Sequence, residues 1–201
     1  MAGPDRIDVL DRKVLSDGWS VLARYRIAYH REDGTTQELT REVYERGHGA
    51  VILPYDPDRG TVLLARQFRL PVHLNGQDGF LIEAAAGLLE EADPAARIRA
   101  EAEEELGLTL TDVRQIWDVF MSPGAVTERL IFFVARYGAA DRTGPGGGLE
   151  EEGEEITVME LPFRAALDMV DSGAIRDAKT IMLLQYAALN LFDLSAQEPQ
   201  T

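Results

Sequence analysis

The sequence contains no cysteine among its 201 residues. This absence excludes a disulfide scaffold, a thiolate nucleophile and cysteine ligation of zinc or iron. Long hydrophobic runs are also missing. No stretch approaches the roughly 18 apolar residues that cross a bilayer, and the N-terminal MAGPDRIDVL has neither the basic start nor the apolar run of a secretory signal. We therefore expect a cytoplasmic protein without a membrane partner.

Basic residues are scarce relative to acidic ones. The chain has 20 Lys and Arg against 35 Asp and Glu, which gives a formal net charge of −15. Because a protein that binds a phosphate backbone needs a basic surface, we expect no nucleic-acid partner. Apolar residues make up 45% of the chain. This fraction is enough for the core of one domain of ordinary size, alone or with a small appendage.

The acidic excess is concentrated in two segments. Residues 90–105 hold seven acids and two bases, and residues 150–155 hold five acids and no base. A Glu-rich run is most often a solvated helix face, but a local excess of carboxylates also suits a bound cation. The spacing of the acids distinguishes these two interpretations.

The N-terminal region, residues 1–47, predicts a small antiparallel sheet with a turn at Glu32-Asp33-Gly34. The expected strands are Ile7–Val14, Val21–His30 and Glu38–Tyr44.

The remaining residues, 48–201, predict a larger α/β domain. Asp93 and Pro94 favour the start of a helix and Gly107 favours its end. The order of elements indicates an α/β sandwich with a mixed sheet between helices, rather than a doubly wound fold. The expected strands are Ala50–Tyr55, Thr61–Phe68, Phe80–Ala85, Val113–Met121, Arg129–Tyr137 and Ile156–Leu161. Two further helices, Phe163–Asp171 and Asp177–Leu191, follow a long Gly-rich acidic loop, Ala139–Glu155.

The helix that begins at Pro94 gathers carboxylates beside its apolar stripe. At 100° per residue, Glu101, Glu104 and Glu105 share an arc of about 100°, whereas Glu103 faces elsewhere. The adjacent buried stripe consists of Ala95, Ile98, Ala102 and Leu106. The carboxylates therefore border the core, where a hard cation such as Mg²⁺ or Mn²⁺ would relieve their repulsion and hold a diphosphate.

Residues 87–108, GLLEEADPAARIRAEAEEELGL, resemble the sequence box of the Nudix hydrolases, which cleave nucleoside diphosphates linked to another moiety. The match is specific at Gly87, Glu101, Ala102, Glu104, Glu105, Gly107 and Leu108. Asp93 replaces the first Glu of the box, the spacing to its second half is one residue short, and Ala100 stands where Arg is usual. Arg97 or Arg99 could supply the missing charge.

The resemblance extends over residues 9–192 to the Nudix branch that contains GDP-mannose hydrolases and ADP-ribose pyrophosphatases. Pro123 lies 16 residues after Gly107, a spacing typical of this branch. The resemblance implies a Nudix α/β/α sandwich preceded by an antiparallel sheet that helps to form a homodimer. Its first strands would then reach the partner's active site. The matching segments are Arg41-Glu-Val-Tyr44, Arg66-Gln-Phe-Arg69, Ser122-Pro-Gly124 and Ile175–Thr180.

The resemblance also implies roles for individual residues. Ligands of Mg²⁺, with Mn²⁺ as a substitute, are expected to be the carbonyl of Ala86 together with Glu101, Glu104, Glu105 and Glu152. Glu152 and Glu104 are the expected catalytic residues, Glu152 as the group that activates water, and Glu151 and Glu154 compete for that role. Substrate contacts are expected at Trp19, Arg41, Glu42, Arg69, Ala86, Gly87, Leu88, Glu128, Glu151 and Lys179.

The implied reaction is Mg²⁺-dependent hydrolysis of a nucleoside diphosphate sugar. The similarity favours GDP-mannose, giving GMP and mannose 1-phosphate, over ADP-ribose, giving AMP and ribose 5-phosphate. A catalytically inactive Nudix-fold binding module is a further alternative. Such a module would be expected to lose acids of the box, and this chain keeps three of them. The scattered His30, His48 and His73 are interpreted as structural.

Overall fold

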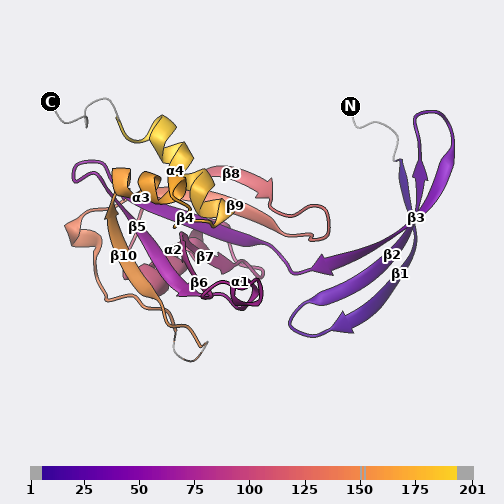
Figure 1. Cartoon of the computed structure of the whole chain (residues 1–201), viewed down its shortest axis with the longest axis horizontal. Coiled ribbons are helices and arrows are strands. Elements are labelled where there is room, and N and C mark those ends of the chain that lie inside the picture. The colour runs from indigo at the N-terminus through magenta and orange to yellow at the C-terminus, as the bar shows by residue number, and fades with distance from the viewer. Residues whose placement is uncertain (1–5, 150, 152, 194–201) are drawn as a thin grey trace. The chain divides into compact units, whose positions relative to one another are not determined.

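The computed structural model describes residues 6–149, 151 and 153–193, and the chain divides into two compact units (Figure 1). The first unit comprises Met1–His48 and Val119–Arg129, and the second comprises Gly49–Asp118 and Leu130–Thr201.

The first unit contains a three-stranded antiparallel sheet, sheet A, which confirms the predicted N-terminal antiparallel sheet. Its strands β1 (Ile7–Asp17), β2 (Val21–His30) and β3 (Thr36–Glu45) are hydrogen-bonded in the order β1-β2-β3. Almost every side chain of β1 is exposed. As an edge strand of sheet A, β1 is therefore open to water.

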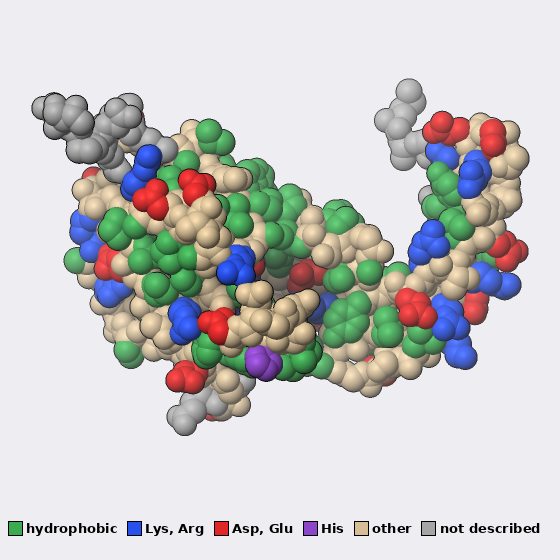
Figure 2. All heavy atoms as spheres, in the orientation of Figure 1, with side chains coloured by type: hydrophobic (Ala, Val, Ile, Leu, Met, Phe, Trp, Pro, Cys, Tyr) green, Lys and Arg blue, Asp and Glu red, His purple; other side chains and the backbone are tan. Residues whose placement is uncertain are grey.

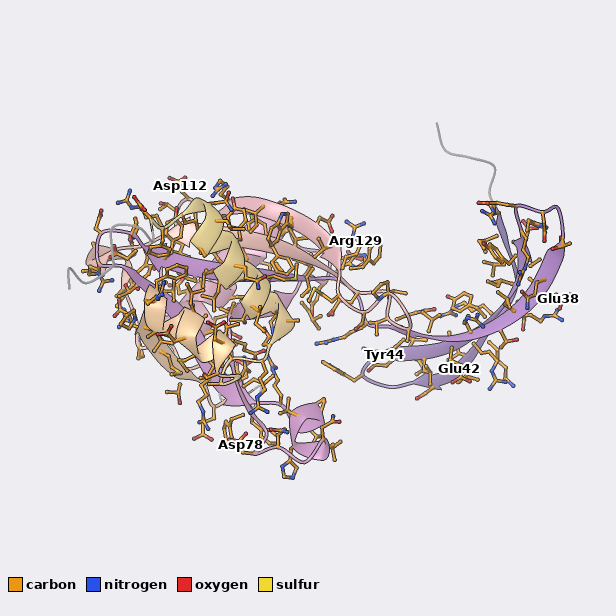
Figure 3. The ribbon with its side chains drawn as sticks, turned by 45° about the horizontal axis from the view of Figure 1, so that its top comes forward. Glu38, Glu42, Tyr44, Asp78, Asp112 and Arg129 are labelled. Carbon is orange, nitrogen blue, oxygen red and sulfur yellow. The ribbon has the colours of Figure 1, made fainter. Side chains whose placement is uncertain are left out.

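Cross-strand ion pairs run along sheet A. Glu42 on β3 lies opposite Arg24 on β2 at 3.1 Å, and Glu38 lies 3.8 Å from Arg26. Figure 3 shows Glu38 and Glu42 on the same strand, and Figure 2 shows acidic and basic side chains interspersed over this sheet. Opposite charges on facing residues stabilise a pair of strands, but exposed pairs contribute little each.

The second unit is built on a mixed sheet, sheet B, in the order β10-β5-β4-β9-β8, with β6 paired to β5 and β7 paired to β4. The central strand β4 runs parallel to β9 and antiparallel to β7. The strands are β4 (Gly49–Asp56), β5 (Thr61–Phe68), β6 (Phe80–Glu83), β7 (Ala85–Leu88), β8 (Arg114–Phe120), β9 (Arg129–Arg136) and β10 (Thr157–Pro162).

Helices cover both faces of sheet B, which confirms the predicted sandwich. Seven of the eight residues of β4 are buried, as its continuous apolar run requires of a strand covered on both faces. Ala50 and Ile52 join the core that α2 (Pro94–Leu106) covers. Successive side chains of a strand point to opposite faces, so Val51 and Leu53 face the other layer. That layer contains α3 (Phe163–Asp171) and α4 (Ala178–Asn190).

The ends of α2 are as predicted. The Asp93 carboxylate accepts a hydrogen bond from the backbone N–H of Ala96 at 2.9 Å, and Pro94 occupies the first helical turn. Gly107 ends the helix with a φ of 69°, in the left-handed region that glycine adopts without strain.

The structure differs from the expectation for Phe80–Ala85, which is two strands instead of one. At Ala84 the chain leaves its pairing with β5 and begins to pair with β4. The Ala84 N–H is satisfied by the Thr180 hydroxyl at 2.7 Å instead of by a strand. The short helix α1 (Leu70–Leu74) and the 3-10 turn Ala139–Asp141 were also not expected. No helix in the described parts of the chain is long and apolar enough to cross a membrane.

Candidate active site

The acidic edge of α2 is buried as its helical phase predicts. Glu101 and Glu105 are 6% and 2% exposed, although each carries a carboxylate. Glu104 is half-buried beside them, and Glu103 is exposed. The helix therefore turns two of its four acids into the protein, where ionised groups need compensation.

Glu101 reaches the backbone of β7. A Cβ atom added to Gly87 would lie 1.7 Å from Glu101 Oε1, so only glycine leaves room for this carboxylate. Ala86, whose carbonyl is an expected metal ligand, precedes Gly87 on the same strand. The structure thus brings together the strand and helix halves of the sequence box.

Arg97 supplies the charge that Ala100 lacks in the sequence box. Its guanidinium lies 2.5 Å from Glu101 Oε1 and 3.9 Å from Glu104 Oε2. Arg97 precedes Glu101 by one helical turn, which places the two side chains on the same face. The sequence alone left open whether Arg97 or Arg99 takes this role.

The Gly-rich loop crosses the C-terminal end of α2. The backbone N–H of Gly147 donates to Glu105 O at 3.0 Å, and that of Gly148 donates to Glu104 O at 3.1 Å. Helix ends leave such carbonyls unpaired, so the loop satisfies them. A Cβ at Gly146 would lie 2.5 Å from Glu105 O, which explains the need for glycine at this crossing.

Three neighbouring carboxylates influence Glu105. Burial, together with the carboxylates of Glu101, Glu154 and Glu83, raises the pKa of Glu105 to about 8, and Arg69 opposes this shift. Glu105 Oε2 is buried and has no hydrogen-bond partner among the described residues. This oxygen can therefore accept a bond from a ligand, and it lies among other carboxylates.

This donor set fits a hard divalent cation, because carboxylate and carbonyl oxygens are the ligands such ions prefer. Within the described ranges, no three acidic or histidine side chains are already arranged as a metal site. One physical reason is that the Glu101 carboxylate is turned to Arg97. A cation bound by Glu105 would compete with that ion pair.

Two cations meet a second buried carboxylate, Glu83, which is 1% exposed. Arg69 Nε and Lys179 Nζ donate to its two oxygens at 2.7 and 2.6 Å. Burial alone would lower the pKa of Lys179, but the carboxylates of Glu83 and Asp177 raise it above its ordinary value. Lys179 therefore remains a cation although it is buried.

Sequence reasoning did not identify Glu83, Asp177 or Thr180. A single acid in the apolar run FLIEAAAG was the available signal for Glu83, since an isolated charge in a buried strand needs a partner. Asp177 followed by Thr180 is a typical start of a helix, and its carboxylate accepts from the Thr180 N–H at 3.0 Å.

The predicted substrate contacts of the first unit lie at two places. Trp19 is 77% exposed, with the Arg46 guanidinium 5.0 Å from its ring centre, and Arg46 in turn lies 3.6 Å from Glu128. Arg41 and Glu42 are neighbours on β3 and therefore point to opposite faces of sheet A. A ligand on one face of this sheet can meet only one of them.

The remaining candidates are placed as follows. Leu88 ends β7 opposite Gly49, and Glu151 is exposed. Glu154 accepts a hydrogen bond from the Leu149 N–H at 3.1 Å. Glu152 lies outside the described residues.

A surface cavity of about 550 Å³ lies beside α1, close to the Asp78 side chain labelled in Figure 3. None of the predicted site residues lines it. Its walls are formed by Arg66, Pro71, Val72, Asn75, Gln77, Asp78, Phe80, Leu81, Ile82, Ala174 and Arg176.

The raised pKa of Glu105 predicts a pH-dependent effect of Glu105→Gln on stability in EDTA. The folded protein holds a proton that the unfolded chain releases above about pH 4.5, so this stabilisation is present below that pH and is lost as the pH rises through 8. Glutamine does not titrate. The melting temperature of the variant, relative to that of the parent, should therefore rise between pH 5.5 and 8.5. The expected rise is about 2–4 °C for each kcal/mol of change in the free energy of unfolding. Exposed Glu103→Gln is the control, and a difference independent of pH would contradict the assignment.

Comparisons with known proteins agree with this geometry. Residues 6–44 match the family model described as the GDP-mannose pyrophosphatase NudK N-terminal domain. The GDP-mannose pyrophosphatase of Pectobacterium atrosepticum is 48% identical over 184 residues, which cover 91% of this chain and 94% of that protein. The enzyme of the same name from Klebsiella pneumoniae is 49% identical over 181 residues, 90% of each chain.

A solved structure described as an ADP compounds hydrolase has the same fold. It superposes with a TM-score of 0.67 at 15% sequence identity and covers 92% of this chain and 94% of its own. Three findings point to the same family: the sequence box, the α/β/α sandwich and the relatives of nearly half identity. This chain therefore belongs to the GDP-mannose pyrophosphatase family of the Nudix hydrolases.

Proposed function

We propose that this hydrolase cleaves GDP-mannose to GMP and mannose 1-phosphate in a Mg²⁺-dependent reaction. The observation that carries the proposal is the Glu105 carboxylate, buried among acids with one oxygen unpartnered. Such a group is ionised at neutral pH only with a cation beside it, and a nucleoside diphosphate sugar brings further negative charge to the same place. The names of the relatives supply the substrate.

Glu101, Glu104, Glu105, Glu152 and the carbonyl of Ala86 would hold the metal. When bound, Mg²⁺ would neutralise charge on the diphosphate oxygens and make the phosphorus more electrophilic. The protein's own part is to fix these donors. Gly87 allows Glu101 to approach β7, and the Gly147 and Gly148 N–H groups hold the carbonyls at the end of α2.

The hydrolysis adds one water molecule. Its oxygen forms a bond to one phosphorus as the bond from that phosphorus to the bridging oxygen breaks, and the bridging oxygen leaves on the other phosphate. Glu152 is our candidate for the group that takes the proton from this water. Glu154 is already engaged with the Leu149 N–H, which leaves it less suited to the role.

Arg69 and Lys179 are our candidates for contacts to the diphosphate and sugar. Each has N–H groups beyond those that bind Glu83, and Arg suits two-point recognition of phosphate oxygens whereas Lys offers a single charge. In the first unit, the exposed Trp19 offers an aromatic surface for a nucleobase, and Glu128 offers a carboxylate.

We also propose that sheet A, within the N-terminal region of residues 1–47, mediates a homodimer. Its exposed apolar side chains and open β1 edge are features that a second copy could cover. They include Ile7, Val9, Leu10 and Val14.

Activity should require both the cation and the buried acids. EDTA should abolish turnover and Mg²⁺ or Mn²⁺ should restore it. Glu105→Gln and Glu152→Gln should each lower kcat by about 10²-fold or more, as expected when transition-state charge stabilisation or proton transfer is lost. Exposed Glu103→Gln should retain activity. Steady-state assays of the phosphate released after phosphatase treatment measure the effect of EDTA and of each variant. Full turnover in EDTA would end the metal proposal.

Substrate choice is tested by kcat/KM for GDP-mannose, ADP-ribose and ADP-glucose at one Mg²⁺ concentration. We expect GDP-mannose to be preferred, because the relatives of nearly half identity carry that name. ADP-ribose is the second candidate, favoured by the spacing of Pro123 from Gly107. A tenfold preference for ADP-ribose, equivalent to about 1.4 kcal/mol, would replace the proposed substrate and leave the family assignment intact.

The dimer is tested by light scattering at micromolar concentration. A mass of twice the 22.2 kDa chain is expected, because the exposed apolar side chains of sheet A would be buried between two copies. A mass of one chain would contradict it.

A further inference from the structure

A closed set of hydrogen bonds joins the β6–β7 junction to the start of α4. The Ala84 N–H donates to Thr180 Oγ1 at 2.7 Å, and the Thr180 hydroxyl donates to Asp177 Oδ2 at 2.6 Å. Lys179 Nζ then donates to Asp177 Oδ1 at 2.9 Å and to Glu83 Oε2 at 2.6 Å. Glu83 and Ala84 are consecutive residues, so the set closes on itself.

Arg69 enters this set at the other oxygen of Glu83. Its Nε and Nη2 both lie 2.7 Å from Glu83 Oε1. The set then contains two cations, Arg69 and Lys179, and two carboxylates, Glu83 and Asp177, and is neutral overall. Buried charges are tolerated when they are paired and hydrogen-bonded in this way.

The two cations keep donors for a ligand. An ammonium has three N–H groups, of which Lys179 uses two for Glu83 and Asp177. A guanidinium has five, and the edge of Arg69 beyond Nε and Nη2 is not used by Glu83. Binding of a phosphate therefore does not require either ion pair to break.

We propose that Glu83 is a positioning residue, which holds Arg69 and Lys179 beside each other so that both contact one diphosphate substrate. Residues 69 and 179 come from opposite ends of the second unit's sequence, and Glu83 is the one described carboxylate that binds both. The Thr180 hydroxyl fixes Glu83 through the adjacent Ala84 backbone. The identity of the substrate in this inference rests on the proposed function. The arrangement of Arg69 and Lys179 around Glu83 does not depend on it.

A double-mutant cycle tests whether Glu83 acts through Lys179. Glu83→Gln and Lys179→Gln should each lower kcat/KM for GDP-mannose by about 10- to 100-fold. Either change removes one of the two ion pairs of a buried charge, so that Arg69 and Lys179 are no longer held beside each other. The loss in the double variant should be clearly smaller than the product of the two single losses, because Lys179→Gln removes one of the two cations that Glu83 positions. Additive losses, or an unchanged Glu83→Gln enzyme, would overturn the proposal.

Asp56→Asn is the matched control for stability. Asp56 is also a buried carboxylate, 5% exposed, and accepts from Arg59 Nε at 2.6 Å at the hairpin between β4 and β5. Its loss should lower the melting temperature as Glu83→Gln does, yet leave kcat/KM within about twofold. If Asp56→Asn reduces kcat/KM as much as Glu83→Gln does, the effect of Glu83 is structural and the proposal fails.

A second measurement separates this inference from the proposed substrate. The same cycle is repeated as calorimetric affinity for inorganic pyrophosphate with Mg²⁺, which needs no turnover. Non-additive losses of affinity support the positioning role even if GDP-mannose is not hydrolysed, an outcome that would overturn only the proposed function. Additive losses of affinity would overturn the positioning role even if GDP-mannose is the substrate.

Discussion

The compensation of buried negative charge is the constraint on which the second unit depends. Glu83, Glu101 and Glu105 are almost inaccessible to water, and the carboxylates of Glu83 and Glu101 both raise the pKa of Glu105. Arg97 neutralises Glu101, while Arg69 and Lys179 neutralise Glu83. Glu105 is left without a donor to one of its oxygens among the described residues. The proposed Mg²⁺ would compensate the charge of Glu105, which the protein's own cations do not neutralise.

Glycine makes this concentration of acids sterically possible. Gly87 lets Glu101 approach a strand, and Gly146 lets a loop cross the end of α2. In both places a single methyl group would overlap an oxygen atom of the acidic helix. The backbone of the loop therefore lies against the end of α2 that carries the carboxylates. There the N–H groups of Gly147 and Gly148 help to hold this helix in place.

Local chemistry made much of this fold predictable from the sequence. The capping residues Asp93 and Gly107 defined α2, and the helical phase of its acids correctly separated exposed Glu103 from its buried neighbours. Alternating and apolar runs defined most strands. The break at Ala84 was not predictable in this way, because its cause is a hydrogen bond to Thr180, 96 positions later in the chain. Local patterns carry no information about such a partner.

Partners that lie far apart in the sequence also limited the prediction of the candidate active site. Arg69 and Lys179 were predicted as substrate contacts from the resemblance, but Glu83, the carboxylate that binds both, was missed. A lone acid in an apolar strand signals a partner without saying which one. The choice between Arg97 and Arg99 was open for a similar reason, since both lie near the missing charge in sequence and only the packing of α2 brings Arg97 to Glu101.

The connection between Glu83 and α4 also has a consequence for the order in which the chain folds during synthesis. Sheet A pairs strands that follow one another, so it can form early on local contacts. Glu83 must wait for Lys179 and Thr180, which are made about a hundred residues later. Until α4 emerges, the Glu83 carboxylate at the end of β6 lacks one of its two cations, and the Ala84 N–H lacks the acceptor that it has in the folded protein. Completion of sheet B is therefore tied to α4, the last helix in the described part of the chain.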